Sequence, residues 1–196
     1  MSMQNRSFGV RAIKVFALLA AAALAPRAAS ADGDNPQASQ PGVTLGGRAA
    51  YFKAKGANDG ALYGGAQLRL HFTSVLAVEG SVDERQDKFG GTTVDETPVQ
   101  ASLMLYLAPS SVISPYILGG VGYYYTHVQG VSGSTNRYGP HAGAGLEAAL
   151  SQHWTIDGSF RYLWTQSLTA PTTAYPAGHN FSDNGFMVTA ALNYRF

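Results

Sequence analysis

The sequence predicts an all-β protein, folded as an eight-stranded antiparallel up-and-down transmembrane β-barrel. Apolar and polar residues alternate with a period of two along most of the chain, which is the pattern of half-buried strands. Long and shorter connections alternate between these segments, as the outer loops and periplasmic turns of transmembrane barrels do. Only 13% of the residues are charged, against roughly 25% in an ordinary globular domain.

The composition excludes several other classes of protein. A membrane-spanning helix needs about 20 consecutive apolar residues, and the longest such run here, Val15 to Ala25, has eleven. The chain contains no cysteine, which excludes a disulfide scaffold and a thiolate metal site. The net charge of +1 gives no reason to expect a nucleic-acid partner.

The first 31 residues have the pattern of a secretory signal peptide. A basic region ending at Lys14 precedes the apolar run, and Ala29-Ser30-Ala31 forms an A-x-A cleavage site. The run is short for an uncleaved anchor and lacks the periodicity of a buried helix. We therefore predict a signal peptide at 1–31, a flexible polar segment at 32–42 and the barrel domain at 43–196.

The strands follow from the alternation, and the clearest case is the segment 154–165. Trp154, Phe160 and Trp164 share one face of it, while Asp157 and Arg161 share the other. The same pattern returns in the last twelve residues. The eight predicted strands are 43–53, 61–72, 75–85, 97–107, 115–126, 138–150, 154–165 and 185–196.

The polar face of the strands indicates a filled barrel interior. An eight-stranded barrel is just wide enough for side chains to fill it, and unpaired charges there would be costly. The charges assigned to this face are four of each sign, which predicts an internal salt-bridge cluster with a structural or selectivity role; a solvated soluble surface is the alternative. The cluster comprises Arg48, Arg69, Glu79, Asp83, Glu147, Asp157, Arg161 and Arg195.

The apolar face carries aromatic residues eight to ten positions apart on three strands. With a rise of ~3.3 Å per residue and a tilt of ~40°, this spacing separates two belts by roughly 20–25 Å, close to the apolar band of a transmembrane barrel. A general preference of aromatics for strands does not explain the spacing. The predicted membrane-interface aromatics are Tyr116, Tyr124, Trp154, Tyr162, Trp164, Phe186, Tyr194 and Phe196.

These features together resemble small bacterial outer-membrane β-barrel proteins of the OmpA/OmpX/OmpW-like, porin-family class. The resemblance rests on the signal peptide and on the segments SPYILGGVGYYY, GPHAGAGLEAAL, WTIDGSFRYLW and GFMVTAALNYRF. It implies a location in the outer membrane of a Gram-negative cell, reached through the periplasm. It also implies contact with outer-membrane lipids, a monomeric state, and an assembly signal (Leu192, Tyr194, Phe196) for the barrel-assembly machinery.

We find no motif that predicts catalysis, a metal site or a cofactor. The five histidines are scattered and lack a metal-ligand spacing. His179, Ser182 and Asp183 could in principle form a hydrolytic set, as in lipid A-modifying barrels, but closeness in a loop does not establish triad geometry. We therefore expect that the protein is not an enzyme, and a lipid A-modifying activity stays a minor alternative.

Two functions remain open from the sequence. One is an envelope structural component or a narrow passive route for small solutes. The other is a surface interaction or adhesion protein that acts through its outer loops, which are rich in Gly, Ser, Thr and Asn. A filled eight-strand interior argues against a wide channel.

Overall fold

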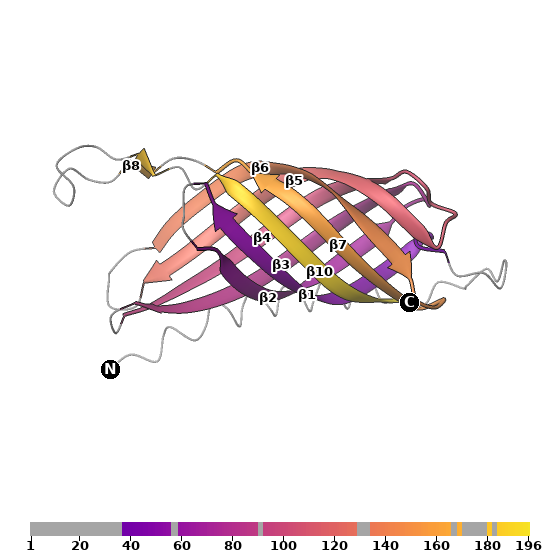
Figure 1. The fold of residues 1–196 in the computed structure, drawn as a ribbon, viewed down its shortest axis with the longest axis horizontal. Coiled ribbons are helices and arrows are strands. Elements are labelled where there is room, and N and C mark those ends of the chain that lie inside the picture. The colour runs from indigo at the N-terminus through magenta and orange to yellow at the C-terminus, as the bar shows by residue number, and fades with distance from the viewer. Residues whose placement is uncertain are drawn as a thin grey trace.

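The computed structural model describes residues 37–55, 59–89, 92–128, 134–165, 168–169, 180–181 and 184–196. Eight strands form one closed antiparallel barrel in the order β1-β10-β7-β6-β5-β4-β3-β2 (Figure 1). Two further short strands, β8 and β9, pair with each other. The predicted fold class is therefore confirmed.

The barrel strands follow the chain in an up-and-down path, and pairing of β1 with β10 closes it. No helix among the described residues is long and apolar enough to cross a membrane. The strand bounds are β1 Gly42–Ala54, β2 Ala61–His71, β3 Leu76–Phe89, β4 Thr92–Tyr106, β5 Ile113–Val128, β6 Ser134–Ala149, β7 Trp154–Leu163, β8 Leu168–Thr169, β9 Asn180–Phe181 and β10 Gly185–Arg195.

The four strands from β3 to β6 are longer than predicted and extend into segments expected to be outer loops. Backbone pairing continues to Phe89 with Thr92 in one hairpin and to His127 with Ser134 in the next. The alternation of apolar and polar residues ends before these tips, so the sequence pattern stopped short there. Hydrogen bonding of the backbone needs no such alternation, and it carries the four strands beyond the rest of the barrel wall (Figure 1).

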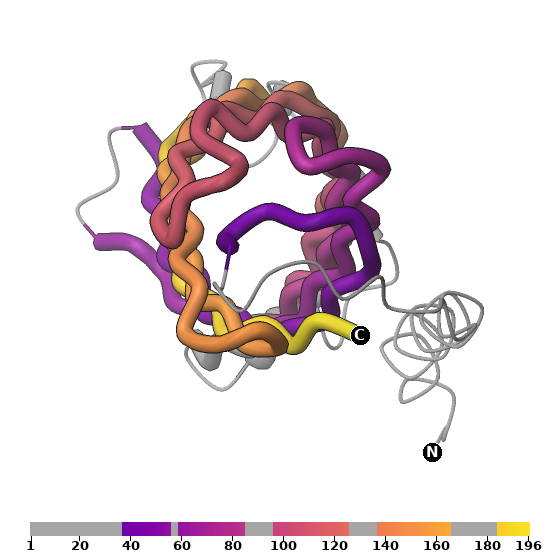
Figure 2. The backbone as a smooth tube through the Cα atoms, turned by 90° about the vertical axis from the view of Figure 1, so that its right-hand side faces the viewer, coloured from indigo at the N-terminus to yellow at the C-terminus, as the bar shows by residue number. Residues whose placement is uncertain are grey.

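One end of the barrel carries the C-terminus and the short turns, which is the periplasmic end in transmembrane barrels. The described part of the predicted flexible segment, residues 37–41, lies across this opening (Figure 2). Ala38 and Ser39 are fully buried there. This part of the segment is therefore packed against the barrel.

Side chains alternate strictly between the lumen and the outer surface along most of the strands. In β7 the burial pattern switches at every residue, with Thr155, Asp157, Ser159 and Arg161 buried inside. The buried interior therefore consists largely of polar and charged side chains, with two smaller clusters of buried apolar residues, and most large apolar side chains lie outside. This arrangement suits a barrel whose outer surface meets lipid.

Candidate functional site: the lumen charge cluster

The structure brings the eight predicted lumen charges together inside the barrel. All eight residues are buried, with relative exposures of 5% or less. They come from six strands and lie at the lumen face: Arg48 on β1, Arg69 on β2, Glu79 and Asp83 on β3, Glu147 on β6, Asp157 and Arg161 on β7, and Arg195 on β10. Four guanidinium and four carboxylate groups give this set a formal charge of zero.

Arg69 is the centre of the cluster. Its Nε donates to Glu79 at 2.7 Å, its Nη1 to Glu147 at 2.8 Å and its Nη2 to Asp157 at 2.8 Å. The guanidinium also lies over the ring of Tyr116, 5.6 Å from the centroid. A planar guanidinium with five N–H donors can serve several carboxylates at once, so one buried cation joins four strands.

Glu79 also interacts with Arg161 and Arg48. Its Oε1 accepts from Arg161 Nη2 at 2.7 Å and lies 3.7 Å from Nη1 of Arg48. Arg161 also donates to Gln100 Oε1 at 3.2 Å and to Ser159 Oγ at 3.0 Å. The charged ends of Glu79 and Arg161 are therefore surrounded by partners, which a buried ion requires.

Two of these contacts cross the full width of the lumen. Arg69 of β2 reaches Glu147 of β6, and Arg161 of β7 reaches Glu79 of β3. In the order of the closed barrel, each pair joins strands four places apart in a ring of eight. Strands with that separation lie on opposite walls, so charged hydrogen bonds span the interior from wall to wall.

A bidentate pair lies next to this centre. Arg48 donates through Nε and Nη2 to the two carboxylate oxygens of Asp83, at 2.7 and 2.6 Å. Asp157 receives further donors from Gln67 Nε2 at 2.9 Å and from Asn193 Nδ2 at 2.7 Å. The neutral amides of Gln67 and Asn193 thus supply hydrogen bonds to the Asp157 oxygen that no arginine contacts.

Arg195 differs from the other three arginines. Its Nη2 lies 3.8 Å from Glu147 Oε1, but it donates to the backbone oxygen of Ala38 at 2.6 Å. It therefore connects the cluster to the segment that crosses the periplasmic opening.

Tyr116 and Tyr124 correct the prediction for the interface aromatics, because both point into the lumen. Their exposures are 1% and 6%, whereas the neighbouring Tyr123 is 45% exposed. Tyr116 donates to Asp157 Oδ1 at 3.2 Å. The register of β5 is thus one residue from the predicted one, because glycines at 119, 120 and 122 remove the contrast between its two faces.

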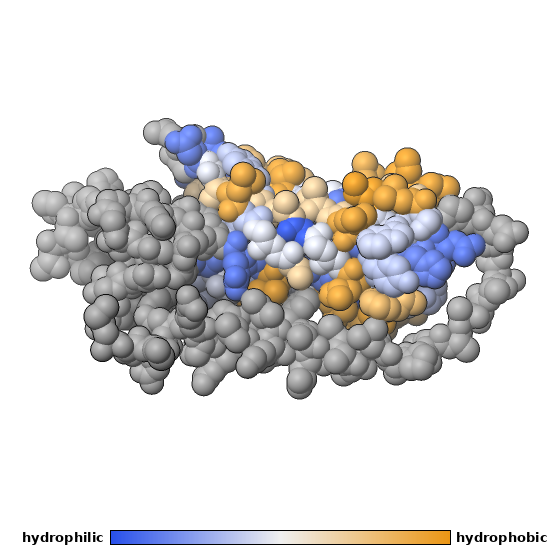
Figure 3. Space-filling view, turned by 90° about the horizontal axis from the view of Figure 1, so that it is seen from below, coloured by the Kyte–Doolittle hydropathy of each residue, from blue (hydrophilic) through white to orange (hydrophobic). Residues whose placement is uncertain are grey.

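The other six predicted interface aromatics lie on the outward face of β7 and β10 or directly after these strands. At the periplasmic end, Tyr194 packs edge-on against Trp154 and Phe196, with ring centroids 5.1 Å apart in each case. At the other end, Tyr162 packs against Trp164 at 5.0 Å, and Phe186 stacks on Phe160. Leu192, Tyr194 and Phe196, the residues of the predicted assembly signal, are all outward and exposed. Figure 3 shows hydrophobic groups along the visible outer surface.

Sequence reasoning missed the neutral partners of the cluster. Tyr106 donates to Glu147 Oε2 at 2.5 Å, and Gln67, Gln100 and Asn193 are buried beside the charges. Their position on the same alternating face as the charges is the signal that could have identified them. A long polar side chain on the lumen face of a filled barrel is expected to bond to its charges.

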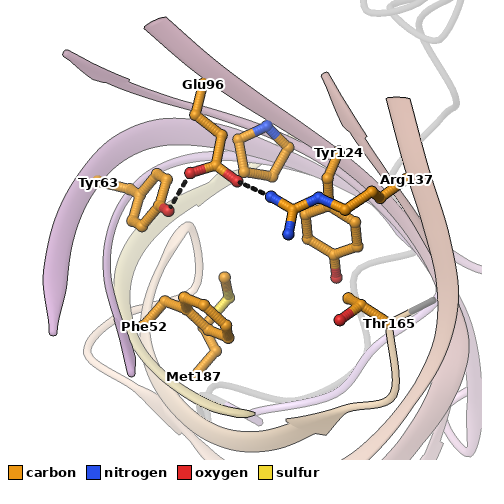
Figure 4. A pocket seen from close by; sticks show the side chains of 8 residues that line it. Phe52, Tyr63, Glu96, Tyr124, Arg137, Thr165 and Met187 are labelled. Carbon is orange, nitrogen blue, oxygen red and sulfur yellow. Dashed lines mark hydrogen bonds and ion pairs between the residues drawn. The ribbon is translucent and has the colours of Figure 1, made fainter. Parts of the chain in front are cut away.

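A second polar group lines a small cavity at the outer mouth of the lumen (Figure 4). Glu96 accepts from Tyr63 OH at 2.8 Å and lies 3.6 Å from Arg137 Nη2. Phe52 and Met187 form the apolar side of this cavity. The space open to water is about 20 Å³, enough for an ordered water molecule.

The described histidines take part in packing and hydrogen bonding. His141 Nε2 lies 2.8 Å from Ser102 Oγ in the lumen, and His153 stacks on Tyr194 at the periplasmic turn. Within the described ranges, no group of three or more His, Asp or Glu side chains could hold a metal ion. His179, Ser182 and Asp183 lie outside the described ranges.

The fold is shared with solved outer-membrane barrels. OprG from Pseudomonas aeruginosa is 17% identical, with a TM-score of 0.58 over 83% of this chain and 99% of that one. Neisserial surface protein A is 14% identical, with a TM-score of 0.59 over 79% and 97%. Ail from Yersinia pestis, solved with the heparin analogue sucrose octasulfate, is 19% identical, with a TM-score of 0.51 over 83% and 100%.

The family itself is shown by sequence. No curated protein matches the chain closely enough to count as a relative. The profile of the outer membrane protein beta-barrel domain matches residues 15–196, which is most of the chain and includes all eight barrel strands. Together with the closed barrel, its polar interior and its apolar outer face, this match identifies the chain as a member of the outer membrane protein beta-barrel domain family, an outer-membrane β-barrel protein.

Proposed function

We propose that the protein serves the outer membrane as a closed structural barrel rather than as a route for solutes. The observation that carries this proposal is the pair of charged contacts between opposite walls, Arg69 with Glu147 and Arg161 with Glu79. A solute that entered the lumen would have to separate these buried ions. Breaking one buried pair costs about 3–5 kcal/mol, and several contacts would have to open together.

Conductance across a planar lipid bilayer tests this proposal directly. The purified barrel is expected to insert without discrete current steps, under conditions in which a general porin gives clear steps. The double variant Arg161→Ala/Glu79→Ala removes one wall-to-wall bridge and both of its charges, and it is expected to raise the current above the wild type. Discrete steps from the wild-type protein would overturn the proposal in favour of a narrow passive route.

As a second candidate, we propose a surface interaction or adhesion protein that acts through the outer end of the barrel. The elongated strands β3 to β6 support it, because they raise one side of the wall beyond the other. The Ail structure, determined with a heparin analogue, suggests an anionic polysaccharide as the first probe.

Adhesion is testable with the barrel in lipid nanodiscs on immobilised heparin. Replacing residues 87–94 with an Asn-Gly turn shortens the β3–β4 hairpin while leaving the pairing of Gln86 with Asp95. Adhesion that this variant loses would support the second candidate. Equal retention of wild type, shortened variant and empty nanodiscs would argue against it.

We further propose that the protein is a non-enzymatic monomer in contact with outer-membrane lipids, inserted by the barrel-assembly machinery through Leu192, Tyr194 and Phe196. Removal of Phe196 is expected to lower the amount of inserted barrel in outer-membrane fractions, whereas Val188→Ala on the same face of β10 is expected to insert normally. For catalysis, Ser182→Ala is expected to leave lipid A composition unchanged. A changed composition would revive the lipid A-modifying alternative.

A further inference from the structure

The segment before β1 runs across the periplasmic end of the lumen and is bonded to the charge cluster through Arg195. Residues 37–41 run across the opening in Figure 2, from inside the ring of strands to the start of β1. Ala38 and Ser39 have relative exposures of 0%. Because Ala38 and Ser39 are removed from water at the barrel mouth, their backbone polar groups need hydrogen-bond partners within the protein.

Two periplasmic turns fasten this segment. The backbone N–H of Ala38 donates to the oxygen of Ser111 at 2.9 Å, in the connection between β4 and β5. Ser39 Oγ donates to the oxygen of Ser74 at 2.7 Å, in the connection between β2 and β3. The segment is thus tied to two separate positions on the rim and spans the space between them.

Arg195 supplies the third attachment. Its Nη1 donates to the oxygen of Gln37 at 3.1 Å and its Nη2 to the oxygen of Ala38 at 2.6 Å. Glu147 Oε1 lies 3.8 Å from the same Nη2 and has no hydrogen-bond partner, although it is buried. The guanidinium therefore faces both two neutral carbonyls and an unsatisfied carboxylate oxygen.

We propose that residues 37–39 form a displaceable plug of the periplasmic mouth and that Arg195 is its latch. With the plug seated, Arg195 holds the carbonyls of Gln37 and Ala38. When the plug leaves, Arg195 turns to Glu147 Oε1 and completes an ion pair. A hydrogen bond between two charged groups is stronger than one to a neutral carbonyl.

This exchange makes displacement of the plug feasible. Without Glu147, release would remove the two carbonyl partners of Arg195 and offer its guanidinium no nearby carboxylate in their place. With Glu147 nearby, the arginine is paired in both states. The wall-to-wall contacts of Arg69 and Arg161 do not involve the plug, so the lumen can stay closed at its centre while its periplasmic end opens. The plug is therefore a second feature, separate from the contacts that close the centre of the lumen, and the proposal of a plug does not depend on the proposed function.

Cysteine labelling tests the plug, because the chain has no cysteine of its own. Ala38→Cys is compared with Ser110→Cys, an exposed position on the same rim, by the rate of reaction with a thiol reagent in detergent micelles. Ala38→Cys is expected to react more than about tenfold slower, since only the opened fraction can be labelled. Equal rates at the two positions would refute the plug.

The latch is tested in the Ala38→Cys background. Arg195→Gln is expected to raise the labelling rate at position 38 and to leave that of Ser110→Cys unchanged. Glu147→Gln is expected to lower the rate at position 38, because it removes the charge that competes for Arg195. A purely structural Arg195 predicts no slowing in Glu147→Gln, so an unchanged or raised rate would overturn the latch.

An oxidative cross-link checks the seated state in the wild-type network. The double variant Ala38→Cys/Ser111→Cys is expected to form a disulfide readily, since a backbone hydrogen bond joins these two residues. Ala38→Cys/Ser151→Cys, on a turn to which the segment is not bonded in the contacts above, is the matched control. Cross-linking no faster in the first pair than in the control would also refute the plug.

Discussion

The centre of the lumen and its outer mouth contain the same combination of side chains, but differ in their exposure to water. In each, an acid is bonded to a tyrosine and an arginine: Glu147 to Tyr106 and Arg69, and Glu96 to Tyr63 and Arg137. The central ion pair is 2.8 Å long with side chains at most 1% exposed, whereas the mouth pair is 3.6 Å long with side chains 14% and 18% exposed.

Position along the barrel, more than residue type, therefore sets the strength of each ion pair. Central charges are cut off from water and depend on their protein partners. Charges at the mouth can be solvated when a partner is lost, so they resemble surface salt bridges. The following variants test this contrast, beginning with the one expected to cost the most stability.

Loss of the central arginine is expected to have the largest effect. Arg69→Leu leaves Glu79, Glu147 and Asp157 without their shared donor, so the free energy of unfolding should fall by about 3–5 kcal/mol or more. Urea unfolding in lipid vesicles, followed by tryptophan fluorescence, measures it. A loss below that of the mouth variant described last would contradict the contrast.

A pair of neighbouring glycines tests how closely the central wall is packed. A Cβ on Gly120 would overlap the backbone oxygen of Ala101 and lie 2.7 Å from the Cα of Ser102, whereas one on Gly119 would meet no atom closer than 3.9 Å. Gly120→Ala should therefore lower the free energy of unfolding by about 1–3 kcal/mol.

Gly119→Ala is the matched control for this variant. It should leave stability unchanged or raise it slightly, since alanine restricts the unfolded chain. The same unfolding assay compares them, and equal stabilities of the two variants would show that the approach of β4 and β5 is looser than described.

The register could be predicted from the sequence on β7 and β10, but not on β5, where Tyr116 and Tyr124 point into the lumen. On β7 and β10, large aromatics on one face and charges or small polar groups on the other fixed the register, and the structure agrees with that prediction. On β5, tyrosines occur at three consecutive positions, and the glycines before them mark neither face. The hydrogen bonds of Tyr116 to Asp157 and of Tyr124 with Gln100, which join different strands, show which face of β5 enters the lumen.

The same contrast explains which of the lumen charges could be predicted from the sequence. The central charges lie within alternating segments, so their face could be counted from the sequence. Glu96 and Arg137 lie in segments predicted to be loops, where the alternation had ended, and their pairing depends on strands that continue beyond it. The plug at 37–39 was not predicted because its hydrogen bonds run to distant turns, a relation that no local pattern encodes.

Removing one hydroxyl on each face of β5 tests the corrected register. Tyr116→Phe loses the hydrogen bond to Asp157 and should lower the free energy of unfolding by about 1 kcal/mol. Tyr123→Phe removes an outward hydroxyl and should change stability by less than about 0.5 kcal/mol, as a surface substitution does. Unfolding in vesicles compares the two, and the reverse order would restore the register predicted from sequence.

The smallest effect is expected at the outer mouth. Arg137→Leu removes the long contact to Glu96, but Glu96 keeps the hydrogen bond from Tyr63 OH and reaches water. The free energy of unfolding should therefore fall by less than about 1 kcal/mol. Glu96→Gln is the control, because the amide oxygen can still accept from Tyr63 while the negative charge is lost. A loss in Arg137→Leu that matches that of Arg69→Leu, and that high salt does not reduce, would mean that the mouth is as dry as the centre.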